Sequence, residues 1–149
     1  MFLTLAAICA AVLCLLIGIR IKRKRDQRDM EMHSITPEAL HSLLASNQEI
    51  HVYDVRVPLD FLADSVIIVG ATRIAPKDIL ERPSLIPKDK DSVVYCTCPS
   101  DQTSQTILRR ARALGFSRIK FLQGGLEGWK ARGYPVEPYK ESFHLDTAS

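Results

Sequence analysis

The chain has 149 residues, of which 25% are charged and 46% hydrophobic, as expected for a folded protein of one domain. Its net charge of +3 is unevenly placed, because segment 20–28 holds six basic residues and one acidic residue and leaves the rest with −2. A mildly acidic body argues against a nucleic-acid partner, and four cysteines in a chain of this length exclude a small disulfide scaffold.

The first predicted element is an apolar helix. No charged residue lies between Met1 and Ile19, and a helix of this length spans about 28 Å, close to the roughly 30 Å hydrocarbon core of a bilayer. A cleaved signal peptide would have basic residues before the apolar run, whereas here they follow it. The abrupt change to basic residues also argues against a buried core helix. We therefore expect residues 1–19 to form an uncleaved, single-pass transmembrane anchor.

Basic segment 20–28 (the basic collar) predicts the orientation of this anchor. Lysine and arginine beside a membrane helix stay on the cytoplasmic side. We therefore expect a protein of the cell inner membrane, with its N-terminus outside and its domain in the cytoplasm. Residues 20–33 would form the collar and a linker or helical extension, residues 34–138 the domain, and residues 139–149 a loose tail.

Helix and strand patterns alternate along the domain. Thr36 is a predicted helix N-cap, followed by a proline and an acidic residue. Further helices are predicted at Pro58–Ala63, Pro76–Glu81, Thr103–Leu114 and Gly128–Arg132. Strands are predicted at Ile50–Val55, Ala71–Ile74, Ser92–Cys96 and Ile119–Leu122, with Val66–Val69 as a further candidate. This alternation predicts an α/β fold with a mostly parallel sheet.

The loop after the strand Ser92–Cys96 is the most informative segment. The next helix is expected to begin at Thr103 or Ser104, so that Cys96 faces backbone N–H groups at a helix N-terminus. Such a site stabilises a thiolate and the negative charge of a persulfide or an oxyanion. A thiolate there can attack a sulfane sulfur and pass it on. The alternative is that Cys96 is a buried residue at a strand end and Cys98 an incidental neighbour.

Six segments, in this order and spacing, resemble the rhodanese family. They are Tyr53-Asp54-Val55-Arg56, Gly70-Ala71, Val93-Val94-Tyr95-Cys96, Leu114-Gly115-Phe116, Leu122 to Trp129 and Gly133-Tyr134-Pro135-Val136. The resemblance covers about Ile35 to Pro138. It implies an open five-stranded parallel sheet flanked by helices, here after a transmembrane helix, and favours a loop at Val66–Val69. It also implies a persulfide on the loop cysteine, sulfur transfer from a donor such as thiosulfate to a thiol acceptor, and no cofactor.

The active loop departs from the family's usual form, in which a cysteine is followed by a glycine and, near the loop's end, an arginine. Here Cys96 is followed by Thr97, Cys98, Pro99, Ser100, Asp101, Gln102, Thr103 and Ser104. The Cys-x-Cys-Pro form looks like a subgroup of bacterial rhodanese-like domains, some attached to integral membrane proteins. Thiosulfate is a doubtful donor, because no base offsets its charge and Asp101 would repel it. A small-molecule or protein persulfide is expected instead.

The two loop cysteines are assigned different roles. Cys96 follows the strand directly and is predicted to carry the sulfur. Cys98 precedes Pro99, which has no N–H to offer, so Cys98 is predicted to be an auxiliary thiol. An inserted residue would shift Cys98 to the centre of the loop and reverse the assignment.

Several residues outside the active loop are expected to have mainly structural roles. Asp54 and Arg56 lie near the active loop in the family, but Arg56 is expected to pair with Asp60 or Asp64 and only to support the site. Gly124-Gly125 predicts a tight turn from strand to helix. The arginines at 109, 110 and 112 are expected to form a solvated helix face, with the steering of an acidic partner or an anionic donor as the alternative. No metal site is predicted, because the histidines are scattered along the chain and the two loop cysteines supply too few ligands for structural zinc.

Three other functions compete with sulfur transfer. A phosphatase or arsenate reductase needs an arginine at the sixth position after its cysteine (Cys-x5-Arg). That position holds Gln102 when counted from Cys96 and Ser104 when counted from Cys98. A catalytically weak or inactive rhodanese fold could serve as a binding module at the membrane, which the missing arginine favours. A thiol redox protein would use Cys96 and Cys98 as a pair.

Overall fold

The computed structural model describes residues 2–97 and 109–140, and it describes no side chains for residues 2–7 and 30. The chain forms two compact units, Met1–Met32 and His33–Ser149.

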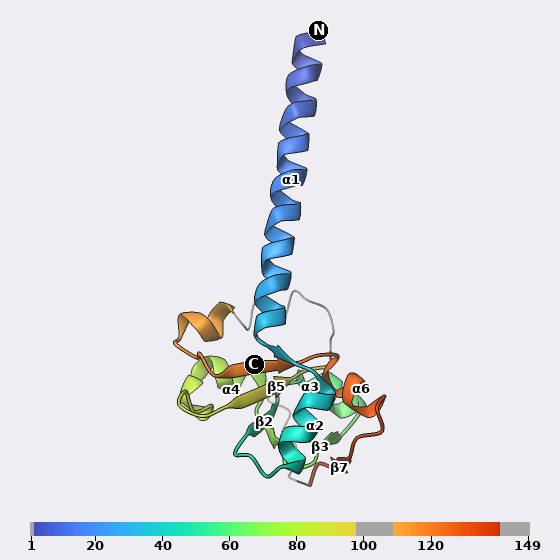
Figure 1. Ribbon diagram of the computed structural model, residues 1–149, viewed down its shortest axis with the longest axis vertical. Coiled ribbons are helices and arrows are strands. Elements are labelled where there is room, and N and C mark those ends of the chain that lie inside the picture. Colours follow the sequence, from blue (N-terminus) through green and yellow to red (C-terminus); the bar gives the residue numbers. More distant parts are fainter. Residues whose placement is uncertain (1, 98–108, 141–149) are drawn as a thin grey trace, which may run out of the picture. The chain divides into compact units, whose positions relative to one another are not determined.

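The first unit is the helix α1 (Phe2–Met32), drawn in blue in Figure 1. It continues through the basic collar, and its apolar side chains from Ile8 to Ile21 are exposed. Among the described residues, no helix is apolar over a sufficient length to cross a membrane. The structure therefore does not confirm the transmembrane helix expected over residues 1–19.

The second unit is built on a five-stranded sheet. The strands are β1 (Ser34–Ile35), β2 (His51–Asp54), β4 (Thr72–Arg73), β5 (Ser92–Tyr95) and β6 (Ile119–Leu122). Their order across the sheet is β1-β6-β5-β2-β4, and every neighbouring pair is parallel. The predicted α/β fold with a five-stranded parallel sheet is confirmed. The register pairs Asp54 of β2 with Tyr95 of β5, so these two strands end side by side.

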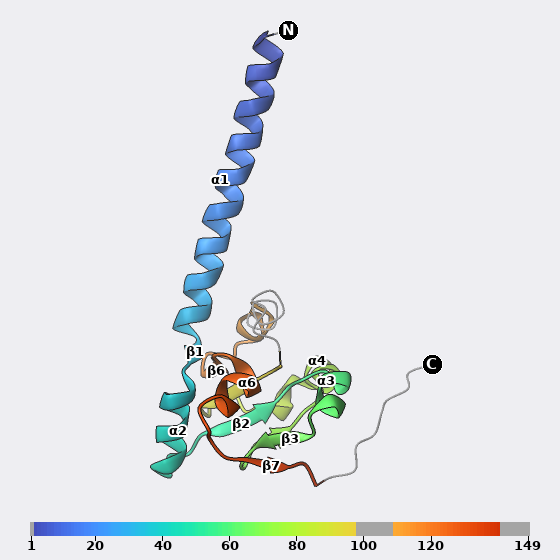
Figure 2. The same cartoon turned by 90° about the vertical axis from the view of Figure 1, so that its right-hand side faces the viewer.

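A second, two-stranded sheet lies outside the main one. Strand β3 (Val66–Ile68) pairs antiparallel with β7 (Val136–Pro138), and the two run side by side in Figure 2. The loop that the family resemblance favours over Val66–Val69 is therefore wrong for its first three residues. Ile67 and Ile68 are buried, and their partner strand comes from the far end of the domain. Such a long-range pairing satisfies the backbone of a segment whose apolar side chains are needed in the core.

Helices flank the sheet. They are α2 (Pro37–Ala45), α3 (Pro58–Ala63), α4 (Pro76–Glu81), the short 3-10 helix η1 (Pro83–Leu85), residues 109–113 and α6 (Gly125–Lys130). Thr36 caps α2 as predicted, because its Oγ1 accepts a hydrogen bond from the N–H of Ala39 at 3.2 Å. The last helix begins at Gly125, earlier than the expected Gly128. The first part of the predicted helix Thr103–Leu114, up to residue 108, lies outside the described residues.

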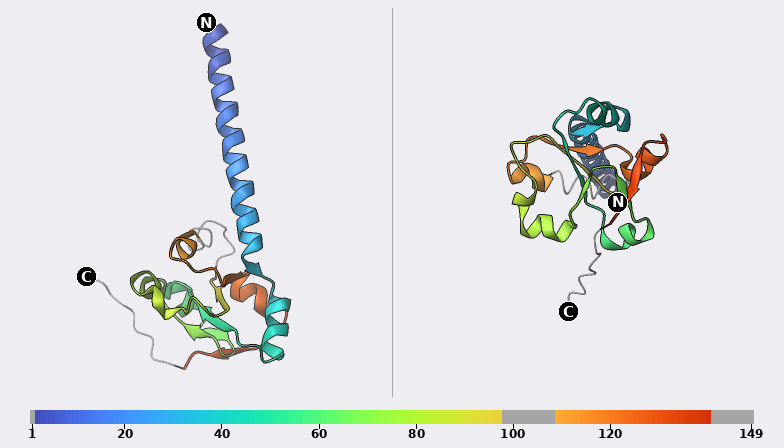
Figure 3. Two further views of the ribbon diagram at one scale, coloured as in Figure 1. Left: turned by 60° about the vertical axis from the view of Figure 1, so that its left-hand side comes forward. Right: turned by 90° about the horizontal axis from the view of Figure 1, so that it is seen from below.

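The two faces of the sheet carry separate cores. Side chains alternate along a strand, so Val93 and Tyr95 of β5 pack with Leu40 of α2 and Trp129 of α6, while Val94 faces the other side. Helix α4 and residues 109–113 lie together on that other side, away from α6 (Figure 3). The covering of both faces explains why the central strand β5 is buried along its whole length.

The start of the predicted loose tail is attached to the domain. The N–H of Tyr139 donates to the carbonyl of Ser65 at 2.9 Å, and its ring lies edge-on against Phe61 with the centroids 5.0 Å apart. The expected tail of residues 139–149 is therefore wrong for Tyr139. Residues 141–149 lie outside the described part of the chain.

Candidate active site

The candidate nucleophile lies where the central strand of the sheet ends. Strand β5 ends at Tyr95, and Cys96 follows directly, half-buried. Its neighbour across the sheet, β2, ends at Asp54. In parallel sheets, ligands bind beyond the carboxyl ends of the strands, which is where Cys96 lies.

A glycine turn holds the backbone of Cys96 in place. Gly124 and Gly125 join β6 to α6 with φ angles of +71° and +55°, and a Cβ on Gly125 would lie 2.0 Å from the carbonyl oxygen of Cys96. The N–H of Leu126 points at the same oxygen, at 3.4 Å. The predicted tight turn is confirmed, and the structure adds its reason: only glycine permits this approach to Cys96.

Thr97, the residue after Cys96, carries a polar side chain whose hydroxyl is buried next to the candidate nucleophile. Its Oγ1 is buried, and within the described part of the chain no group forms a hydrogen bond with it. Most buried polar groups in folded proteins have a hydrogen-bond partner, so this one requires an explanation. No sequence pattern indicates it, because the partners of a hydroxyl depend on the folded loop.

The remaining predicted loop residues are not placed by the structure. Cys98, Pro99, Ser100, Asp101, Gln102, Thr103 and Ser104 all lie outside the described residues. The expected nest of N–H groups and the division of roles between Cys96 and Cys98 therefore stay predictions.

Asp54 and Arg56 form a buried ion pair next to the site. Arg56 Nη2 lies 2.6 Å from Asp54 Oδ2, and Arg56 Nε donates to both carboxylate oxygens at 3.0 Å. The guanidinium also donates to the carbonyl oxygens of Asp64 at 2.8 Å and Val66 at 2.7 Å. The sequence predicts that Arg56 pairs with the carboxylate of Asp60 or Asp64, which is wrong, because its guanidinium pairs with Asp54. That carboxylate of Asp64 instead pairs with Lys130 at 2.6 Å.

Arg73 completes this group, which we call the charge cluster (Asp54, Arg56 and Arg73). Arg73 Nη1 lies 3.7 Å from Asp54 Oδ1 and donates to the Asp54 carbonyl at 3.1 Å. Burial lowers the pKa of Arg73, and the charge of Asp54 opposes that shift. Both guanidinium groups also lie over the ring of Phe61, at 5.0 and 4.8 Å from its centroid. Asp54 and Arg56 are fully buried, so neither side chain is available to bind a sulfur donor.

Tyr95 links the end of β5 to the second sheet. Its phenol oxygen accepts a hydrogen bond from the N–H of Ile68 at 3.1 Å. Burial raises the pKa of this phenol, and the nearby carboxylate of Asp54 raises it further. The phenol therefore stays protonated at neutral pH and acts as a structural group rather than a base.

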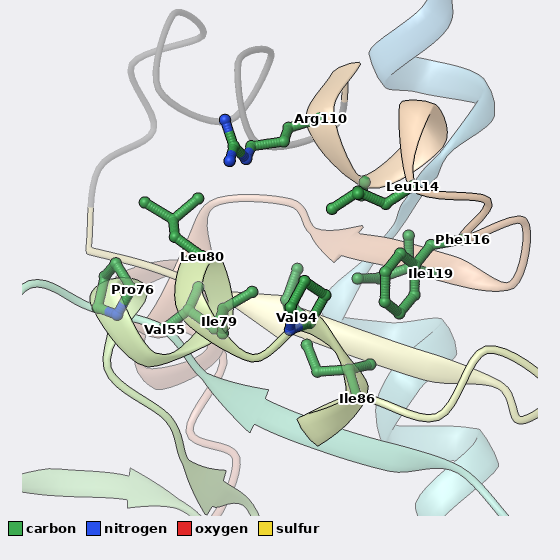
Figure 4. Close-up of a pocket in the computed structure, with 12 residues that line it drawn as sticks. Val55, Pro76, Ile79, Leu80, Ile86, Val94, Arg110, Leu114, Phe116 and Ile119 are labelled. Carbon is green, nitrogen blue, oxygen red and sulfur yellow. The ribbon is translucent and has the colours of Figure 1, made fainter.

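A separate apolar cavity lies on the other face of β5. It has a volume of about 180 Å³, and Ile79 and Leu80 of α4, Val94 of β5, Leu114 and Phe116 are among its walls (Figure 4). Arg110 also lines it, whereas Arg109 is simply exposed. The described lining residues include no nucleophile, so this cavity is not the place of the sulfur chemistry. No cluster of three metal-ligating side chains occurs among residues 2–97 and 109–140 either.

The chain is similar in sequence to one protein family and to proteins named as sulfurtransferases. A family model described as rhodanese-like domain matches residues 36–132. A protein named sulfurtransferase from Allochromatium vinosum is 30% identical over 105 residues, covering 70% of this chain and 94% of that protein. The probable adenylyltransferase/sulfurtransferase MoeZ from Mycobacterium tuberculosis is 32% identical over 105 residues. That match covers 68% of this chain but only 26% of the longer protein.

Solved structures show the same fold. The Alr3790 protein from Anabaena sp. is 29% identical, with a TM-score of 0.58, over 70% of this chain and 82% of that one. A full-length protein from Lactobacillus plantarum is 25% identical, with a TM-score of 0.66, over 80% of this chain and 99% of that one.

Proposed function

The chain belongs to the rhodanese-like domain family, and on this basis we propose that it is a sulfurtransferase that carries a sulfane sulfur as a persulfide on Cys96. One observation carries the proposal: Cys96 follows the central strand, half-buried, with its backbone fixed against Gly125. The relatives named as sulfurtransferases support the reaction class.

The proposed reaction has two displacements. The thiolate of Cys96 attacks the outer sulfur of a persulfide donor, a new S–S bond forms, and the donor leaves as a thiolate that takes up a proton. An acceptor thiolate then attacks the outer sulfur on Cys96, and Cys96 departs as a thiolate. No cofactor takes part. Cys98 is proposed as the auxiliary thiol that resolves or protects the persulfide.

The proposed donor carries a single negative charge. No lysine or arginine lies between Cys96 and Ser104, so no base of the loop can pair with the two charges of thiosulfate. Arg56 does not replace it, because its guanidinium is buried on Asp54. A small-molecule or protein persulfide is therefore the proposed donor, and a thiol the proposed acceptor.

We further propose that the N-terminal segment attaches the domain to the inner membrane, with the domain in the cytoplasm. This proposal rests on the sequence: the charge-free run Met1–Ile19 is followed by the basic collar. Membrane fractions should retain the full chain after washing with high salt and release it into detergent. Release by salt alone, or digestion of the domain by protease added outside intact cells, would contradict this location.

Sulfur transfer by the full chain in detergent tests the proposed function directly. A small-molecule persulfide, a protein persulfide and thiosulfate are offered in parallel, and sulfur reaching a thiol acceptor is measured. We expect turnover with a persulfide and little with thiosulfate. The variant Gln102→Arg should improve thiosulfate use by about tenfold or more, since a charge-assisted hydrogen bond contributes roughly 1.5–3 kcal/mol. If no donor loads the protein, the alternative of a rhodanese-fold binding module replaces the enzyme.

A further inference from the structure

The hydroxyl of Thr97 is a buried polar group that the packing of the described residues does not explain. Thr97 Oγ1 is shielded from solvent, and no described group forms a hydrogen bond with it. A buried hydroxyl without a partner destabilises the folded state, because it has lost water and gained nothing. An apolar residue of the same shape would avoid that loss, so the hydroxyl points to a role toward a bound group.

This hydroxyl belongs to the residue whose peptide bond joins it to Cys96. Thr97 is the next residue in the chain, and the Cys96 carbonyl is locked against Gly125 and the N–H of Leu126. A donor carried by a peptide that is held in this way needs little reorganisation when charge arrives beside it. The group that gains charge beside Thr97 is the sulfur that Cys96 receives.

We propose that Thr97 Oγ–H donates a hydrogen bond to the terminal sulfur of the Cys96 persulfide and so fits the site to singly charged donors. The inference rests on the proposed function and extends it. An arginine would match the double charge of thiosulfate, whereas one hydroxyl offers one neutral hydrogen bond. Thr97 thereby takes part in the stabilising role that the family's loop arginine fills elsewhere.

The chemistry assigned to Thr97 balances without any further reagent. Cys96–S⁻ and R–S–S⁻ react with one proton to give Cys96–S–S⁻ and R–SH. The bond between Cys96 Sγ and the transferred sulfur forms while the S–S bond of the donor breaks. Thr97 keeps its proton throughout and only donates a hydrogen bond to the charged terminal sulfur.

Two replacements of Thr97 test the inference on the full chain. Thr97→Val keeps the shape and removes the hydroxyl, while Thr97→Ser keeps the hydroxyl. Thr72→Val is the matched control, because Thr72 is exposed on the edge strand β4. The two readouts are thermal unfolding of the unloaded protein and the fraction of Cys96 loaded at equilibrium with a small persulfide, measured by intact mass.

The inference predicts opposite effects on these readouts. Thr97→Val should unfold at the same or a higher temperature than wild type, yet its loading constant should fall by about tenfold or more, as expected for the loss of a hydrogen bond to a charged group. The loading constant of Thr97→Ser should lie within a few-fold of the wild-type value. Thr72→Val should have the wild-type loading constant.

Three results would overturn the inference. If Thr97→Val lowers the unfolding temperature, the hydroxyl has a structural partner. If Thr97→Val loads as wild type does while wild type is active, Thr97 does not contact the sulfur, although the proposed function stands. If wild type itself takes up no sulfur from any donor, the proposed function fails and the role of Thr97 with it.

Discussion

Two groups of polar residues lie at the ends of the neighbouring strands β2 and β5, and they differ in how completely they are satisfied. In the charge cluster, Asp54 and Arg56 are fully buried, and the guanidinium of Arg56 donates to a carboxylate and two carbonyl oxygens. Beside Cys96, which is half-buried, the hydroxyl of Thr97 lacks a partner among the described residues. The first group is closed to ligands and stabilises the fold, whereas the second has a donor left for one.

The largest expected effect separates the two loop cysteines. Cys96→Ser should reduce sulfur transfer by at least about a thousandfold, because a hydroxyl cannot replace the thiolate as nucleophile and carrier. Cys98→Ser should keep a substantial fraction of the wild-type rate. Steady-state transfer from a persulfide to a thiol measures both. A fully active Cys96→Ser variant would move the chemistry to Cys98.

Removing one member of the charge cluster should lower the free energy of unfolding of the domain. Arg56→Met leaves the buried carboxylate of Asp54 without its main partner, and removing one member of a buried pair typically costs about 3–5 kcal/mol. Urea unfolding gives this free energy. Arg118→Met is the matched control, because Arg118 pairs with Asp91 at 3.0 Å on the surface and should change stability little. Equal losses in the two variants would refute the structural role of the cluster.

Gly125→Ala tests the contact that fixes Cys96. The positive φ alone should cost about 1–2 kcal/mol, and the new Cβ would also collide with the Cys96 carbonyl. Gly133→Ala carries the same backbone strain, at φ +71°, but its Cβ would meet nothing within 4 Å. Unfolding free energy and sulfur transfer should both fall further in Gly125→Ala. Indistinguishable variants would show that the close approach to Cys96 has no consequence.

The smallest expected effect is the pH dependence of a surface pair. The guanidinium of Arg118 lowers the pKa of Asp91 below its ordinary value of 3.8. A lowered pKa means that the pair stabilises the domain above the ordinary value and that this stabilisation is lost as the pH falls through the lowered one. Wild type and Arg118→Met should therefore differ slightly in unfolding free energy at pH 7 and converge in strong acid. A difference that grows in acid would contradict the assignment.

The sequence predicted features that depend on local order and failed where distant segments meet. The helix cap at Thr36, the turn at Gly124-Gly125 and the main parallel strands follow from neighbouring residues, and the structure confirms them. The residues of β3 offered a strand candidate, but the family resemblance favoured a loop, and its partner β7 lies near the other end of the domain.

The same limit applies to the candidate site. Cys96 was recognisable from the strand before it, but the true partner of Arg56 was not, since the choice among Asp54, Asp60 and Asp64 depends on burial. The contribution of Arg73 and the isolated hydroxyl of Thr97 also arise only on folding. Which side chains are satisfied is a property of three-dimensional packing, and no spacing rule reports it.

The central claim is that Cys96 carries the transferred sulfur, and peptide mass spectrometry of the wild-type chain tests it most directly. The full protein is loaded with a persulfide labelled in its outer sulfur, exposed thiols and persulfides are alkylated, and the labelled atom is located by fragmentation. The account predicts the labelled sulfur on Cys96, and its loss when a thiol acceptor is added. Labelled sulfur on Cys98 alone, or on neither cysteine, would contradict it.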